Sequence, residues 1–301
     1  MSGNHAHHHS HDDHHHNHQG HRHHRPESRN AFRLSIFLNT ALAVFQILIG
    51  LFFGSIALVG DAIHNLGDVI GLALAWGAER ISRRSATDQY TFGLGRSTQM
   101  ASLTNAVLVL AASVIVVFES VIRIFHPFRV VAVPIAVAAA LGILINLLSA
   151  RLFGDDHHHD LNRRAAVVHM LTDAAVSGAV LISAILVGIT GWFWLDAVVG
   201  VGVGLVVGRS GWRLFKEALS LLMDGVPKGL DAVVLRKRIL AVPGVLDVHD
   251  MRVWSNSTST ISFTAHVHHS RAPQEAAVLL LEIRKILHGM NIDHSTIELD
   301  S

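Results

Sequence analysis

The sequence predicts an α-helical membrane protein with six transmembrane helices, followed by a small α+β domain outside the membrane. Three observations support this fold class. Half of the 301 residues are apolar, with a mean hydropathy of +0.40. Charged residues are concentrated between long apolar stretches, and those stretches stop at Pro227. We therefore assign residues 1–29 to a tail, 30–225 to a membrane domain and 226–301 to a C-terminal domain.

The composition excludes several classes of protein. A formal net charge of +1 argues against a nucleic-acid binder, which usually carries a strong basic excess. The chain has no cysteine, so disulfides, thiolate metal sites and thiol catalysis are absent. Histidine and carboxylate side chains remain as the strong metal ligands. Histidine is the outlier of the composition, with 24 copies.

The tail holds twelve of these histidines among acidic, basic and small polar residues. Such a polar, low-complexity segment buries too little apolar surface to offset the entropy lost on ordering. The sequence therefore predicts that residues 1–29 are disordered.

Six stretches are long enough to span a bilayer, which takes on the order of 20 apolar residues at 1.5 Å each. We expect these spans at residues 32–54, 55–79, 98–122, 130–151, 165–190 and 192–209. In the sixth, Gly200, Gly204 and Gly208 recur every four residues. This spacing fits a strip for close helix packing, but glycine is also generally frequent in membrane helices.

The arginines predict the orientation of the spans. Basic residues flank the first span, the loop after the second, the loop after the fourth and the end of the sixth, whereas the opposite-side loops hold only Arg123 and Arg129. Cytoplasmic loops carry the excess of basic residues, so we expect a multi-pass protein of the cell membrane with both termini in the cytoplasm.

The C-terminal domain shows shorter elements. Ile261, Phe263, Ala265 and Val267 alternate with polar residues, as in a half-buried strand. The expected elements are a helix at 229–241, strands at 245–254 and 260–268, a helix at 273–288 and a strand at 294–300.

The second and fifth spans carry ionisable residues, which cost about 2.5–3.5 kcal/mol each on insertion scales and are therefore functional candidates. His64 and Asp68 lie four residues apart in the second span, on one helix face. His169 and Asp173 repeat this spacing in the fifth. Two imidazoles and two carboxylates fit a tetrahedral Zn²⁺ site better than the oxygen-rich shells of Ca²⁺ or Mg²⁺. Co²⁺, Ni²⁺ and Fe²⁺ accept the same ligands.

A single intramembrane histidine more often bonds to a neighbouring helix than to a metal. Two identical H-x-x-x-D pairs in separate spans favour the metal site. Asp61 precedes His64 by three residues, close to the same face. Three roles stay open for Asp61: it orients the ligands from behind, it carries protons, or it belongs to a local polar network.

Further motifs resemble those of the cation diffusion facilitator family of zinc transporters, the bacterial metal cation efflux proteins. The matching residues are Ser55 to Leu72, Phe92-Gly93-Leu94-Gly95-Arg96, Asn105, Asn146, Asp160-Leu161-Asn162 with His169 and Asp173, and Asp224-Gly225-Val226-Pro227. The resemblance covers nearly everything from residue 30 to 301. One departure is Thr98, where the family often has an acidic residue.

This resemblance implies a six-helix transport domain, a cytoplasmic ferredoxin-like domain, a homodimer and metal/proton antiport. It implies zinc selectivity, with cadmium disfavoured, because a histidine stands at position 64. It also implies regulatory metal ligands at His249, His266 and Asp300. Spacing supports these partly, since His266 and His268 share a strand face; His269 and His294 are further possibilities, and ordinary surface histidines are the alternative.

These features predict export of Zn²⁺ from the cytoplasm in exchange for protons. Zn²⁺ requires deprotonated ligands, and histidines change charge in the physiological pH range, so metal and protons compete at the site. A cytoplasmic loop with His157, His158 and His159, together with the tail, is expected to collect metal near the site. The bland interpretation is a solvated loop that binds metal incidentally.

Three other classes fit less well. A metallo-hydrolase would show H-E-x-x-H, and an ATP-driven pump a G-x-x-x-x-G-K-[ST] loop; neither occurs. A histidine-rich metal buffer explains the tail but not paired ligands inside membrane spans. We therefore do not expect an enzyme.

Overall fold

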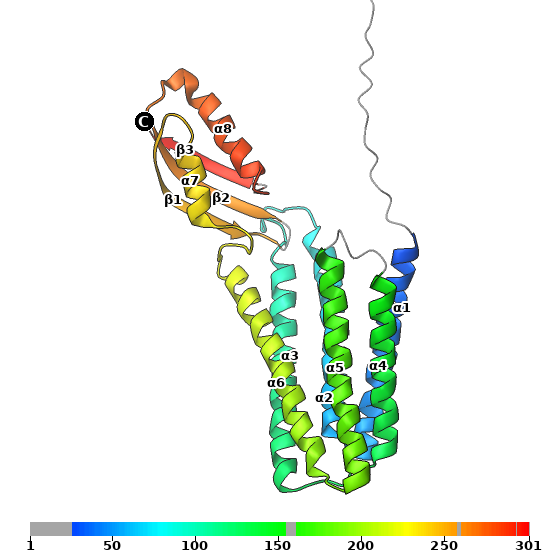
Figure 1. Ribbon diagram of the computed structural model, residues 1–301. Helices are drawn as coiled ribbons and strands as arrows, with labels where there is room; N and C mark the ends of the chain where they lie inside the picture. The colour runs from blue at the N-terminus through cyan, green and yellow to red at the C-terminus, as the bar shows by residue number, and fades with distance from the viewer. Residues whose placement is uncertain (1–25, 155–160, 258–259, 293, 301) are drawn as a thin grey trace, which may run out of the picture.

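The computed structural model describes residues 26–154, 161–257, 260–292 and 294–300. Within these ranges, six helices are long and apolar enough to cross a membrane, as predicted. They are α1 (Pro26–Phe53), α2 (Ile56–Ser82), α3 (Ser97–Phe125), α4 (Ala132–Gly154), α5 (Leu161–Thr190) and α6 (Trp194–Leu222). The six helices run roughly alongside one another, and the C-terminal domain lies beyond one end of them (Figure 1). We call this end the domain end and the opposite one the far end.

The helices pack as two groups around α2. Helix α3 packs chiefly against α6, and α4 against α5, while α2 contacts α1, α3, α5 and α6. The α3–α6 pair stands directly beneath the C-terminal domain (Figure 1). Helix α2 therefore contacts helices of both groups, which also meet directly where α5 packs against α6.

The far end is held by a set of contacts that we call the far-end clamp: Ser55, Arg123 and Asp196. The buried Asp196 carboxylate, from α6, accepts hydrogen bonds from Ser55 Oγ (2.5 Å) and from the Ile56 backbone N–H (2.8 Å). Arg123, from α3, donates to the Gly54 carbonyl at 2.8 Å. An α6 carboxylate thus caps the N-terminus of α2, whose first N–H groups have no partner within their own helix.

Gly54 makes the short connection between α1 and α2 possible. Its φ of +83° lies in the left-handed region that favours glycine. A Cβ atom there would lie 2.7 Å from the Arg129 carbonyl oxygen. The tight turn places Ser55 and the start of α2 within hydrogen-bonding distance of Asp196.

Two helix boundaries differ most from the sequence prediction, and several others differ by three or four residues. Helix α6 continues to Leu222, beyond the expected end at residue 209, and α1 begins at Pro26, inside the segment expected to be disordered. Apolar composition marks where a helix can lie in lipid, not where it ends. The last turns of α6 carry Arg209, Arg213 and Lys216 between apolar residues and continue toward the C-terminal domain.

The glycine strip of α6 faces α3, which favours the packing interpretation over simple abundance. A Cβ on Gly204 would lie 2.6 Å from Val117 Cγ2, and one on Gly200 would lie 2.5 Å from Ser120 Oγ. Larger residues at these positions would push the two helices apart.

The C-terminal domain has the predicted elements: α7 (Ala232–Leu240), β1 (Val245–Ser255), β2 (Ile261–His269), a 3₁₀ turn (Pro273–Glu275), α8 (Ala276–His288) and β3 (His294–Asp300). In the sheet, β2 pairs with β1 antiparallel and with β3 parallel. Phe263, Ala265 and Val267 are buried beneath α7 and α8, confirming the predicted alternation. The order αββαβ is one strand shorter than the βαββαβ ferredoxin-like unit.

The domain contacts the bundle near the start of α3. There Gln99 donates from Nε2 to the Ser255 carbonyl at 2.8 Å. Arg96 pairs with Asp224 at 2.7 Å, which fixes the end of α6 beside the start of α3, just before the domain begins. The domain therefore contacts the α3–α6 pair, the same pair that reaches α2.

We predict that Asp196→Ala destabilises the membrane domain by about 1–3 kcal/mol, because buried donors at the start of α2 lose their acceptor. Asp196→Asn keeps one acceptor oxygen and should lose less. Thermal unfolding in detergent, followed by tryptophan fluorescence, measures both. An unchanged unfolding temperature in Asp196→Ala would contradict the clamp.

Candidate metal centre

The four predicted ligands converge between α2 and α5, which contact each other in antiparallel directions. Because the helices run oppositely, the histidine of one lies level with the aspartate of the other. His64 meets Asp173 in a layer toward the far end, and Asp68 meets His169 in a layer toward the domain end.

The distances within the cluster are short. His64 Nε2 lies 3.2 Å from Asp173 Oδ1, and His169 Nε2 lies 2.9 Å from Asp68 Oδ2. His169 Nε2 is also 3.6 Å from Asp173 Oδ2, which joins the two layers. The two imidazole rings stand edge to face, at 88° and 5.8 Å between centroids.

These distances fit a tetrahedral metal. One ligand atom from each residue lies within 4.8 Å of all the others. Metal–ligand bonds of about 2.0–2.2 Å give tetrahedron edges of about 3.3–3.6 Å. The three measured pairs span 2.9–3.6 Å, so only small side-chain shifts separate them from that geometry.

The two layers differ in exposure. The side chains of Asp68 and His169 are 46% and 49% exposed, whereas those of His64 and Asp173 are 9% and 6% exposed. A cavity of about 180 Å³ adjoins the cluster, and its lining includes Asn39 from α1, Asn65 from α2 and Met170 from α5. The cluster is therefore accessible from the domain-end layer and closed on the other side.

The closed side is formed by a second layer of buried polar side chains, which we call the polar plug: Gln46, Asp61 and Ser177. Asp61 Oδ2 accepts hydrogen bonds from Ser177 Oγ at 2.7 Å and from Gln46 Nε2 at 3.3 Å. All three side chains are fully buried. The plug connects α1, α2 and α5 one helical turn from His64 and Asp173.

The plug packs tightly against α4. A Cβ atom on Gly142 would lie 2.8 Å from Gln46 Nε2 and 3.0 Å from Ser177 Oγ. Gln46 and Ser177 are functional candidates that the sequence reasoning missed. Two signals were available: Gln46 is a polar residue deep in an apolar span, and Ser177 follows Asp173 by one turn.

A second cluster lies on the sheet of the C-terminal domain, where the predicted His249, His266 and Asp300 come together. Asp300 Oδ2 lies 3.3 Å from His266 Nδ1 and 3.6 Å from His249 Nε2. The two imidazole rings stack at 5.3 Å. Three ligand groups within 4.8 Å form a partly exposed, incomplete coordination shell.

The other histidines singled out by the sequence behave differently. His268, His269 and His294 do not join the cluster formed by the described residues. His269 is buried, while His294 begins β3 at an exposed position. The loop with His157, His158 and His159, and the histidines of the tail, lie outside the described residues.

Six apolar helices with a histidine–carboxylate cluster between two of them indicate a multi-pass membrane protein whose helix bundle contains a candidate metal site. Two family models match the chain: the cation efflux transmembrane domain over residues 32–223, and the cytoplasmic domain of cation efflux proteins over residues 227–301. The chain belongs to the cation efflux, or cation diffusion facilitator, family, whose members are transporters and not enzymes.

Individual relatives agree with this family. The chain is 31% identical over 274 residues to the metal cation efflux system protein CzcD of Cupriavidus metallidurans, covering 91% of this chain and 87% of that protein. It is 33% identical over 283 residues to the zinc transporter ZitB of Escherichia coli, covering 91% and 89%. A solved structure, the metal-bound C-terminal domain of CzcD, is 32% identical and covers 24% of this chain and all of that chain, with a TM-score of 0.23.

We predict two separable classes of Zn²⁺ binding. Asp173→Ala should remove the class inside the bundle, and His249→Ala should remove the class on the C-terminal domain, because each substitution deletes a ligand from one cluster only. Isothermal titration calorimetry measures both, in a chain that lacks residues 2–25 and carries asparagine at 157–159. Identical binding isotherms for Asp173→Ala and the parent chain would refute the intramembrane assignment.

Proposed function

We propose that this protein exports Zn²⁺ from the cytoplasm through the site of His64, Asp68, His169 and Asp173, in exchange for protons. The observation that carries the proposal is the crosswise pairing of one histidine and one aspartate from each of two antiparallel helices. It supplies four ligands of the types and separations that Zn²⁺ accepts.

Charge balance supports protons as the counter-ion. With both aspartates ionised and both histidines protonated, the four side chains are neutral together. Zn²⁺ bound to two neutral histidines and two carboxylates is neutral too. An empty site with neither protons nor metal would leave two uncompensated charges in the interior, which is costly. Exchange of one Zn²⁺ for two protons is therefore the neutral exchange.

The accessible side of the cluster indicates which step of the transport cycle this conformation represents. The arginine distribution predicts that the domain end lies in the cytoplasm, and the open layer of Asp68 and His169 faces that end. This arrangement corresponds to a site loading from the cytoplasm. Release requires the far-side polar plug to open and the cytoplasmic cavity to close, as in alternating access around a fixed site.

Zinc is preferred among the metals that fit. The relative named a zinc transporter is 33% identical, while a Bacillus velezensis relative, 28% identical, is named a cadmium, cobalt and zinc/H⁺–K⁺ antiporter. Two imidazoles at the site suit Zn²⁺, and Co²⁺, Ni²⁺ or Fe²⁺ are the alternative cargo.

In this proposal, the metal ligands of the C-terminal domain and the histidine-rich segments assist transport. His249, His266 and Asp300 bind a regulatory Zn²⁺ ion, whose incomplete shell a homodimer or water completes. Dimerisation rests on the cytoplasmic domain of cation efflux proteins that the chain matches. The histidines of residues 1–29 and 157–159 collect metal on the cytoplasmic side.

Asp61 belongs to the polar plug in this proposal. Its carboxylate accepts hydrogen bonds from Ser177 and Gln46, and within the described part of the chain it forms no hydrogen bond with His64. The network interpretation is therefore favoured over an orienting role or proton carriage.

We predict that an acidic lumen accelerates Zn²⁺ uptake into proteoliposomes, because protons leaving the lumen exchange for entering metal. A lumenal zinc-sensitive dye and a pH dye, read together, measure the two fluxes. A protonophore that dissipates the pH gradient should remove the acceleration, and His64→Ala should show neither flux. Zn²⁺ uptake that ignores the gradient would remove proton coupling from the proposal; potassium-free buffers test K⁺ as the counter-ion.

We predict that Asp61→Asn keeps Zn²⁺ flux and its proton coupling, because the amide can still accept the bond from Ser177. Asp61→Leu should reduce flux, since it leaves Ser177 and Gln46 without their partner at a cost of about 1–3 kcal/mol. The same two-dye assay applies. If Asp61→Asn binds Zn²⁺ but loses the coupled proton flux, Asp61 is a proton carrier instead.

A further inference from the structure

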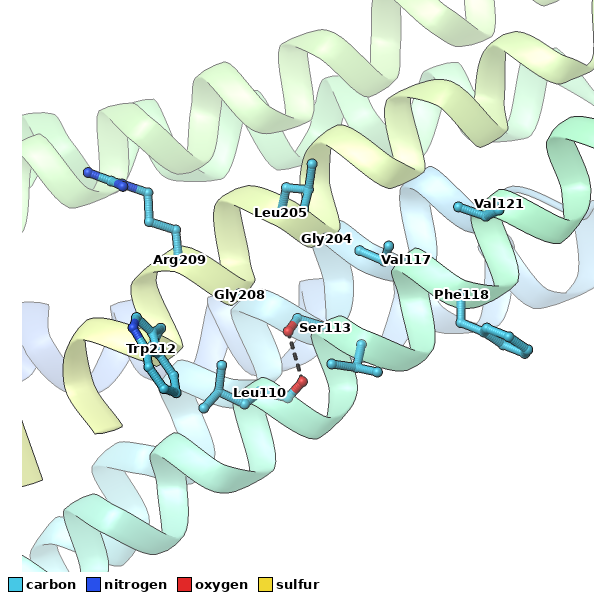
Figure 2. Close-up of a pocket in the computed structure, with 11 residues that line it drawn as sticks. Leu110, Ser113, Val117, Phe118, Val121, Gly204, Leu205, Gly208, Arg209 and Trp212 are labelled. Atoms are coloured by element: carbon cyan, nitrogen blue, oxygen red, sulfur yellow. Dashed lines mark hydrogen bonds between the residues drawn. The ribbon is translucent and has the colours of Figure 1, made fainter. Parts of the chain in front are cut away.

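An apolar groove runs along the bundle between α3 and α6, away from the metal centre. Its volume is about 760 Å³, within the range of small-molecule binding sites. Gly204 and Gly208 line it from α6, where they lie against Val117 and Ser113 of α3 (Figure 2). Because these glycines have no side chains, the two helices approach closely there, and the larger side chains on either side form the walls of the groove.

The walls of the groove are exposed and apolar. Val114 and Phe118 from α3, and Leu205 from α6, are all exposed large hydrophobic residues. Both helices are long and apolar enough to cross the membrane, so this surface lies at the depth of lipid acyl chains. An elongated apolar hollow at that depth matches one acyl chain.

One end of the groove is cationic. Arg209 and Trp212 line it on the side of the domain end, and both are exposed (Figure 2). Arg209 lies about 22 Å along α6 from Trp194, at 1.5 Å per residue, so its long side chain can reach the headgroup region. Within the described part of the chain, Arg209 takes part in none of the arginine or lysine ion pairs.

We propose that this groove binds one anionic phospholipid from the domain-end leaflet, with its phosphate paired to Arg209 and an acyl chain between α3 and α6. Basic pockets between membrane helices on the cytoplasmic side bind anionic headgroups, and tryptophan favours the same interfacial depth. The site is independent of the proposed metal transport.

Charge favours a lipid over a second copy of the chain in this groove. A two-fold axis along the membrane normal brings equivalent residues together at equal depth. Two copies of Arg209 would then meet, and the lining of the groove contains no carboxylate to compensate them. An anionic headgroup supplies the missing negative charge.

Native mass spectrometry of the full chain in detergent tests the proposal, by titration with phosphatidylglycerol and, separately, phosphatidylcholine. We expect one tightly held phosphatidylglycerol per chain. Arg209→Gln should weaken the binding of phosphatidylglycerol about fivefold, the effect of removing one cation near the surface, and weaken that of the zwitterionic phosphatidylcholine less. Arg213→Gln is the matched control, since Arg213 is an exposed arginine one turn further along that does not line the groove.

Val114→Trp fills the hollow from an exposed position and should weaken both lipids, which tests the acyl-chain part separately. Retention of the class of Zn²⁺ binding that Asp173→Ala removes shows that the bundle of each variant is folded. Equal effects of Arg209→Gln and Arg213→Gln would overturn the proposal, because attraction would then belong to the whole basic surface. So would conversion of dimer to monomer by Val114→Trp with lipid binding unchanged, which would make the groove an interface between copies.

Discussion

The cost of charge inside a membrane determines how this bundle is built. Four ionisable side chains lie between α2 and α5, and each histidine contacts an aspartate from the other helix. A shift in the register of the two helices would separate these pairs and leave ionisable groups within the membrane unpaired, which is costly. The pairing therefore favours one relative height of α2 and α5.

The two ends of the bundle are built differently around this centre. At the far end, Asp196 and Arg123 hold the start of α2 through backbone groups, and the polar plug fills the space between α1, α2 and α5. At the domain end, the cluster opens into a cavity. Opening the far side requires breaking several buried hydrogen bonds together, which favours two discrete states over a continuous channel.

The α3–α6 pair links three features of the molecule. At the far end it carries Arg123 and Asp196 of the clamp. At the other end Gln99 bonds to Ser255 of the C-terminal domain, and in between the pair packs against α2. A metal on the C-terminal domain, or a lipid in the groove between the two helices, would therefore act on the same rigid pair. Both have a physical route to α2, the helix that provides His64 and Asp68.

Much of this protein was determined by the sequence itself. Apolar length predicted six spans, alternation predicted the strands of the small domain, and the repeated H-x-x-x-D spacing predicted His64, Asp68, His169 and Asp173, because these patterns depend on contacts within one element. The continuation of α6 to Leu222 was not predicted, since apolar composition reports lipid contact and not helix length.

Only the tertiary structure decided which residues meet across elements. The crosswise order of His64 with Asp173 follows from the antiparallel directions and the heights of two helices. The partners of Asp61, the capping of α2 by Asp196 and the unequal exposure of the two ligand layers depend on packing between helices far apart in the chain. Local periodicity contains no information on those distances, because they are set by how side chains fill the space between helices.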